Sequence, residues 1–183
     1  MKKVLLFATV AVFAACNNQP AATVDASAKT AADSTIAEIK SPYEIGYSSK
    51  FVMGDPKNAE TLLKLWKDWD AGNLMGSKDN FADSVELYMN DGSAIVGKKD
   101  SALATIQAFR NTFASAVSSV FTITALKSVD KDENWALIWG KEIDTDKKGK
   151  VDSFYLQETW RFNKEGKANL IYQFKQAIAP AKK

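Results

Sequence analysis

The sequence predicts an α+β fold in which helices lie on one face of a curved antiparallel sheet. Apolar side chains recur at helical spacing in the first half of the region after residue 55, and segments with strand character follow in the second half. The clearest of these segments is Val151–Phe162, whose even-numbered side chains from Phe154 onward are large and apolar except for Glu158.

The first helix is predicted to begin at Asp55-Pro56 and to end at Ala71-Gly72. Aspartate caps the N–H groups of a first turn, proline fits the first helical position, and glycine adopts the left-handed conformation past a helix end. The predicted buried stripe of this helix is Ala59, Leu62, Leu63, Trp66 and Trp69.

Two further helices are expected before the strands. A short one is predicted at 77–82, with Ser77 as its N-cap. A longer one opens after Gly97, and its apolar positions are Ala102, Ile106, Phe109, Phe113 and Val117.

The strands are predicted from alternation and from the turn residues between them. An extended segment or edge strand is expected at 43–53, and a hairpin at 84–96 turns at Asn90-Asp91-Gly92. Four strands follow at 120–128, 135–144, 151–162 and 169–177, joined by polar turns. A long antiparallel meander after the helices completes the α+β pattern.

The N-terminus predicts a targeting segment and a tether. Lys2 and Lys3 precede an uncharged apolar run that is too short to span a bilayer, which is typical of a signal peptide. Ala14-Ala15-Cys16 resembles the lipobox of bacterial lipoproteins, in which the cysteine is acylated, for example with palmitate. Phe13 stands where such sequences usually carry Leu, and an ordinary secretory signal is the alternative.

We therefore expect a signal peptide at 1–15, a lipidated Cys16 with a flexible tether over 16–41, and one folded domain at 42–183. The tether region is rich in Ala, Ser and Thr and cannot bury enough apolar surface to order itself. Lipid anchoring implies the cell envelope. By the sorting rule of enteric lipoproteins, Asn17 in place of Asp implies the outer membrane of a Gram-negative bacterium.

Composition excludes several function classes. The chain has 24 basic and 22 acidic residues, and this balance gives no electrostatic footprint for nucleic acid. It contains no histidine, which excludes histidine-dependent hydrolase triads and zinc-peptidase motifs. Its one cysteine cannot form an intrachain disulfide. No metal site and no cofactor are expected.

Several motifs between Asp55 and Ala177 carry a resemblance. They are a first helix ending at Ala71-Gly72, then Phe81-Ala82-Asp83 before a strand, Gly97 before a helix, and Trp160-Arg161-Phe162 late in the chain. This pattern resembles the nuclear transport factor 2-like (NTF2-like) superfamily, including its SnoaL-like and ketosteroid isomerase-like members. The resemblance implies a cone-like curved antiparallel sheet wrapped around N-terminal helices, a pocket at the wide end, and frequent dimers through the outer sheet face.

The resemblance does not carry a known activity over to this chain. Ketosteroid isomerases use a tyrosine, an aspartate base and a protonated acid, and the matched motifs put Leu65, Met89 and Glu158 at those positions. Two of the three groups are lost, so the isomerase chemistry is not expected.

Glu158 remains the candidate catalytic residue, and two interpretations are open. It is either a pocket carboxyl that binds a ligand or acts as an acid or base, or a satisfied buried acid paired with Arg110, Lys141 or a tyrosine. The residues expected to contact a ligand are Trp66, Tyr88, Phe109, Trp139, Leu156, Glu158, Trp160 and Tyr172.

Three functions follow as alternatives. The first is a membrane-anchored binding domain for a small apolar ligand. The second is a lyase or isomerase-type enzyme that uses Glu158. The third is an interaction module whose outer sheet face docks a second copy of the chain or another envelope protein. That face carries Tyr155, Gln157, Thr159 and Arg161.

Overall fold

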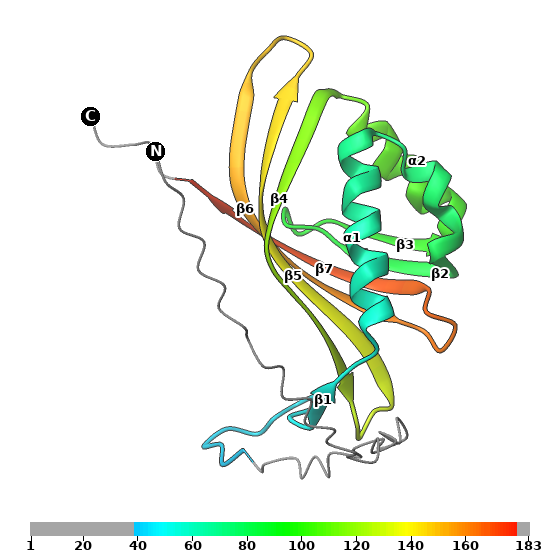
Figure 1. Ribbon diagram of the computed structural model, residues 1–183, viewed down its shortest axis with the longest axis vertical. Coiled ribbons are helices and arrows are strands. Elements are labelled where there is room, and N and C mark those ends of the chain that lie inside the picture. The colour runs from blue at the N-terminus through cyan, green and yellow to red at the C-terminus, as the bar shows by residue number, and fades with distance from the viewer. Residues whose placement is uncertain (1–38, 179–183) are drawn as a thin grey trace, which may run out of the picture. The chain divides into compact units, whose positions relative to one another are not determined.

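The computed structural model describes residues 39–178, in which helices pack against one sheet (Figure 1). In chain order the elements are β1 (Phe51–Met53), α1 (Pro56–Ala71), the 3-10 helix η1 (Leu74–Asn80), β2 (Phe81–Tyr88), β3 (Ala94–Lys98), α2 (Lys99–Arg110), β4 (Phe113–Ser128), β5 (Glu133–Asp146), β6 (Val151–Phe162) and β7 (Ala168–Ala177). The predicted signal peptide, Cys16 and most of the predicted tether lie outside the described residues. Neither α-helix within 39–178 has the length and apolar character needed to cross a membrane.

The seven strands form one curved sheet in the order β1-β4-β5-β6-β7-β2-β3. α1 and α2 lie on the same side of this sheet, which bends around them (Figure 1). The α+β class is therefore confirmed. The sheet is mixed rather than purely antiparallel, because β7 returns beside β2 in the parallel direction while all other neighbours are antiparallel.

The ends of α1 are those that the sequence predicts. The Asp55 side chain accepts a hydrogen bond from the backbone N–H of Lys57, Pro56 is the first helical residue, and Gly72 adopts the left-handed conformation at φ 71°. The predicted stripe is wrong at one position. Leu63 is 38% exposed, and Leu65 is buried in its place, next to Leu62 and Trp66.

The two later helices differ from the prediction. The short helix is η1, which begins three residues earlier than expected and is capped by the Asn73 side chain, so Ser77 lies inside it. The longer helix, α2, ends at Arg110. Phe113 already belongs to β4, whose backbone pairs with β5 from Phe113 opposite Asp146 onward. Phe113 and Val117 therefore matched the helical spacing by chance, since both lie on a strand.

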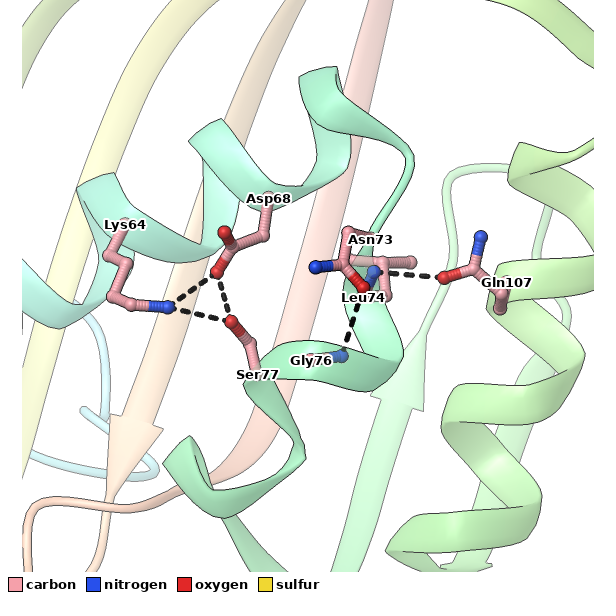
Figure 2. A network of polar contacts seen from close by, with 7 residues as sticks. All are labelled: Lys64, Asp68, Asn73, Leu74, Gly76, Ser77 and Gln107. Carbon is pink, nitrogen blue, oxygen red and sulfur yellow. Dashed lines mark hydrogen bonds and ion pairs between the residues drawn. The ribbon is translucent and has the colours of Figure 1, made fainter.

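A polar network fastens the helices to one another (Figure 2). Lys64 donates to Asp68 on the same helix and to Ser77 on η1, and the Ser77 hydroxyl donates to Asp68. From α2, the Gln107 amide accepts from the N–H of Leu74 at 2.8 Å and donates to the Gly72 carbonyl at 2.9 Å. α1, η1 and α2 are thereby held as one layer on the inner side of the sheet.

Candidate functional site

A cavity of about 420 Å³ lies between the helical layer and the inner face of the sheet. Its wall is mostly apolar and aromatic, with Leu65, Trp66, Trp69, Leu74, Phe81, Met89, Ile95, Leu103, Ile106, Phe109, Phe113, Phe154, Leu156, Trp160 and Ile171. The polar residues in the wall are five acids, two amides, two hydroxyl residues and one lysine: Asp91, Glu142, Asp144, Asp152, Glu158, Asn90, Gln173, Ser93, Thr105 and Lys175. The size and the largely apolar wall are typical of a small-molecule site.

Strand alternation decides which side chains reach the cavity. On β6, the side chains of Phe154, Leu156, Glu158, Trp160 and Phe162 are all buried. The predicted inner face of this strand is therefore confirmed, and all of these side chains except Phe162 line the cavity. The residues between them are half-buried or exposed and belong to the outer face.

Glu158 lies in the cavity wall and receives three hydrogen bonds. Its Oε2 accepts from the indole N–H of Trp66 at 2.6 Å and from that of Trp160 at 2.9 Å. Its Oε1 accepts from the amide of Gln173, directly opposite on β7, at 2.8 Å. Three donors stabilise a carboxylate whose burial would otherwise be costly.

The partners predicted for Glu158 were wrong. Arg110 donates instead to the backbone carbonyls of Trp69 and Asp70 at the end of α1. Lys141 lies on the outer face of β5, where its neighbour on β6 is Tyr155. Tryptophan was missed as a partner because the sequence alone does not show how α1 crosses β6.

A glycine lets α1 approach the sheet at this point. A Cβ added at Gly140 on β5 would lie 2.7 Å from a Trp66 ring carbon and 2.6 Å from the Ser119 carbonyl oxygen of β4. The Trp66 ring therefore occupies the space that any other residue at 140 would fill. This close packing aims the Trp66 indole N–H at Glu158.

A second acidic group, which the sequence analysis missed, lies nearer the rim. Glu142 and Asp144 occupy successive inward positions of β5, and both are about 5% exposed. Trp69, one turn beyond Trp66, donates its indole N–H to Glu142 Oε1 at 2.9 Å. Their i, i+2 spacing indicates that both lie on the same face of a strand. Only the register with β6 shows that this face lines the cavity.

Burial and mutual contact change the titration of this pair. Burial is the largest cause that raises the pKa of Glu142, to about 9, and a hydrogen bond to Asp144 and its charge raise it further. Burial also raises the pKa of Asp144, although the hydrogen bond with Glu142 and the charges of Lys175 and Arg110 act in the opposite direction. Glu142 therefore holds the proton that the pair shares at neutral pH.

The eight residues predicted to contact a ligand divide into two groups. Trp66, Phe109, Leu156, Glu158 and Trp160 all line the cavity. The other three residues do not line it: Tyr88, Trp139 and Tyr172. Tyr88 on β2 and Tyr172 on β7 stack on each other, with ring centres 5.1 Å apart. Trp139 lies on the outer face of β5 and is 38% exposed.

Two further expectations concern the chemistry of the wall. The positions matched to the isomerase groups, Leu65, Met89 and Glu158, lie together in this one cavity. Within residues 39–178, no group of three or more acidic or cysteine side chains is arranged to hold a metal ion.

Solved structures share this architecture at low sequence identity. An NTF2-like protein of unknown function from Exiguobacterium sp. 255-15 has a TM-score of 0.53 and 15% identity, over 63% of this chain and 98% of that one. An NTF2-like protein of unknown function from Burkholderia pseudomallei has a TM-score of 0.53 and 17% identity, over 65% and 90%.

A third similar structure is that of an enzyme. SalBIII, an epoxide hydrolase/cyclase-like enzyme with a role in pyran ring formation in the polyether salinomycin, has a TM-score of 0.55 and 12% identity, over 66% of this chain and 91% of its own. No protein-family model and no curated protein matches the chain. The described part of the chain has the NTF2-like fold.

Proposed function

We propose that this NTF2-like domain binds a small, largely apolar molecule in the cavity between its helices and its sheet. The observation that carries the proposal is the cavity itself, about 420 Å³ with aromatic side chains on both the helical and the sheet side. A binding role needs no group beyond those in the wall.

The test uses a neutral apolar probe, N-phenyl-1-naphthylamine, whose fluorescence increases on entering an apolar site. Ile106→Trp places a larger ring in the cavity wall and is expected to weaken probe binding at least about tenfold, because it fills the space. Val96→Trp, at an exposed position of β3 that does not line the cavity, is the matched control. Equal binding by the two variants would place the probe elsewhere.

Membrane anchoring through Cys16 is part of the same proposal and rests on the sequence. A lipid on Cys16 would hold the binding domain at the envelope, in the outer membrane by the sorting rule given above. Cys16→Ser is expected to move the protein from the membrane to the soluble fraction, and unchanged fractionation would contradict the anchor.

Acid–base catalysis of lyase or isomerase type is the second candidate. It is favoured by Glu142, a buried carboxylic acid that is protonated at neutral pH and lies in the wall with Glu158. A turnover assay on any accepted substrate tests it. Glu142→Gln and Glu158→Gln should each abolish turnover, and unchanged turnover in both would exclude this candidate.

Self-association through the outer sheet face is a separate proposal about partners. Four aromatic side chains of this face are between 38% and 59% exposed, Phe121, Trp139, Tyr155 and Phe174. Gln157 on β6 has Trp139 of β5 as its neighbour on one side and Phe174 of β7 on the other. The aromatic side chains therefore lie close together on the outer face, where a second copy of the chain could bind. Sedimentation should give a dimer for the full chain and a monomer for Trp139→Glu.

A further inference from the structure

We propose that the cavity selects ligands that carry a protonated amine on an apolar body, and that Asp144 is the group that receives the amine. The inference rests on the proposed binding function and specifies the chemistry of the ligand.

The first observation is one oxygen of Asp144 that has no donor, although the Asp144 carboxyl shares a hydrogen bond with Glu142. Asp144 is 6% exposed, lies in the cavity wall, and its Oδ1 is buried with no hydrogen-bond partner in the described structure. A buried carboxylate oxygen that accepts no hydrogen bond is destabilising. A ligand N–H group in the cavity would supply the missing donor.

The second observation is a cross-strand pair of like charges at the same place. Asp144 on β5 lies directly opposite Asp152 on β6, and like charges in such a cross-strand pair repel each other. Glu142 is the next inward residue along β5. A cationic group bound here would add to the charge of Lys175, which pairs with Asp152, in offsetting this repulsion.

The cations nearest to Asp144 form their hydrogen bonds with other groups. Lys175 pairs with Asp152 at 3.1 Å, and its ammonium lies 3.6 Å from the centre of the Phe154 ring. The Arg110 guanidinium donates to the two carbonyls at the end of α1. Both lower the pKa of Asp144 through their charges, yet neither forms a hydrogen bond with its carboxylate.

The surroundings favour an organic cation over a metal ion. The acids do not form a metal-binding group in residues 39–178. Instead, the wall beside them is aromatic: Trp69, Phe109 and Phe113 form a continuous row with ring centres 6.3 Å and 5.2 Å apart. Aromatic faces attract ammonium groups and pack against apolar bodies, so the wall fits both halves of an apolar amine.

The test compares three probes with the same body and different head groups: 4-phenylbutylamine, 4-phenylbutan-1-ol and 4-phenylbutyrate. Binding to the full chain is measured by calorimetry at pH 7.5, where the amine is protonated. The amine is expected to bind about tenfold more tightly than the alcohol, as for a charge-assisted hydrogen bond, and the carboxylate most weakly. Equal binding of amine and alcohol by the wild-type protein would overturn the inference.

Two variants assign the selectivity to a residue. Asp144→Asn keeps the shape of the side chain and removes its charge, so the preference for the amine should disappear while the alcohol still binds. Asp100→Asn, an exposed residue that does not line the cavity, should keep the preference unchanged. An amine preference that survives Asp144→Asn would place the amine elsewhere and contradict the inference.

The outcomes separate this inference from the function on which it rests. If none of the three probes binds, or if Ile106→Trp does not weaken their binding, the proposed cavity function fails. If the alcohol binds in the cavity and the amine binds no better, the function stands and the amine selectivity fails. The wild-type ranking decides this even if a variant does not fold.

Discussion

Glu158 and Asp144 lie in the wall of the same cavity and are almost equally buried, but their surroundings are opposite. Glu158 accepts three hydrogen bonds, two of them from indole N–H groups. Asp144 has an oxygen without a donor and a like charge opposite it. Burial of an acid in a pocket therefore does not by itself identify the group that a ligand contacts. The unsatisfied acid is the one available to a ligand.

Position relative to α1 explains the difference. Trp66 and Trp69 reach the sheet from successive turns of this helix and donate to Glu158 and Glu142. Asp144 is two residues further along β5, beyond the end of this contact. Glu158 therefore joins helix and sheet, while Asp144 remains open toward the cavity.

Removal of Glu158 should cause the largest loss of stability. Glu158→Ala leaves two buried indole donors and the half-buried amide of Gln173 without an acceptor and opens space beside Trp66, so we expect the free energy of unfolding to fall by about 3–5 kcal/mol. Urea unfolding followed by tryptophan fluorescence measures it. A loss below about 1 kcal/mol would mean that the three hydrogen bonds do not stabilise the fold.

Gly140→Ala should have the next largest effect. The added methyl group would meet the Ser119 carbonyl oxygen, which cannot move aside, and the Trp66 ring. Overpacking of this kind is expected to cost about 2–3 kcal/mol. The same unfolding experiment tests it, with a shifted tryptophan emission of the folded state as the sign that Trp66 has moved. Unchanged stability and emission would show that Trp66 is not held by this contact.

The pH dependence of stability should report Glu142. Its pKa is about 9 when folded against 4.5 unfolded, so the folded state binds more protons between these values. The contribution of Glu142 to the free energy of unfolding is therefore fully present below pH 4.5. It is lost as the pH rises toward 9, by at most about 1.4 kcal/mol per pH unit.

Glu142→Gln replaces the titrating carboxyl with an amide that does not titrate. The free energy of unfolding should then decrease less steeply between pH 5 and pH 8.5 than in the wild-type protein. Glu165→Gln, in the exposed turn before β7, is the matched control and should keep the wild-type slope. A wild-type slope in Glu142→Gln would show that Glu142 is not the group that carries the proton.

Asp144→Asn should have the smallest effect and the opposite sign to Glu158→Ala. It removes the repulsion with Asp152, Oδ1 of Asp144 accepts no hydrogen bond that could be lost, and the Asn carbonyl oxygen can still accept from the protonated Glu142. We therefore expect a change between zero and a gain of about 1 kcal/mol in the free energy of unfolding. A loss above about 2 kcal/mol in urea unfolding would make Asp144 a structural acid like Glu158 and would remove the contrast.

Local chemistry made much of the fold predictable. Asp55-Pro56 and Gly72 fix the ends of α1 through caps that any environment would require. Val151–Phe162 was predicted with its correct bounds and face, because alternation over twelve residues is a strong local signal. The parallel pairing of β2 with β7 was not predictable in this way, since it joins segments that are distant in the sequence.

Residues of the site were predictable only where the pattern of a single strand shows which side chains point inward. The inward side chains of β6 followed from its own pattern. Trp139 and Tyr172 were placed in the pocket wrongly, because aromatic residues occur on both faces of this sheet and parity between strands depends on register. Glu142 and Asp144 were missed for the same reason, since an acid in a strand is usually read as facing solvent.

We expect Asp144, and not Glu158, to be the acid that contacts the amine of the ligand. A high-resolution structure of the protein with 4-phenylbutylamine would show which acid binds it. The ammonium is expected within hydrogen-bonding distance of Asp144 Oδ1, with the hydrogen bonds from Trp66, Trp160 and Gln173 to Glu158 unchanged. An ammonium bound to Glu158, with any of these three donors displaced, would contradict it.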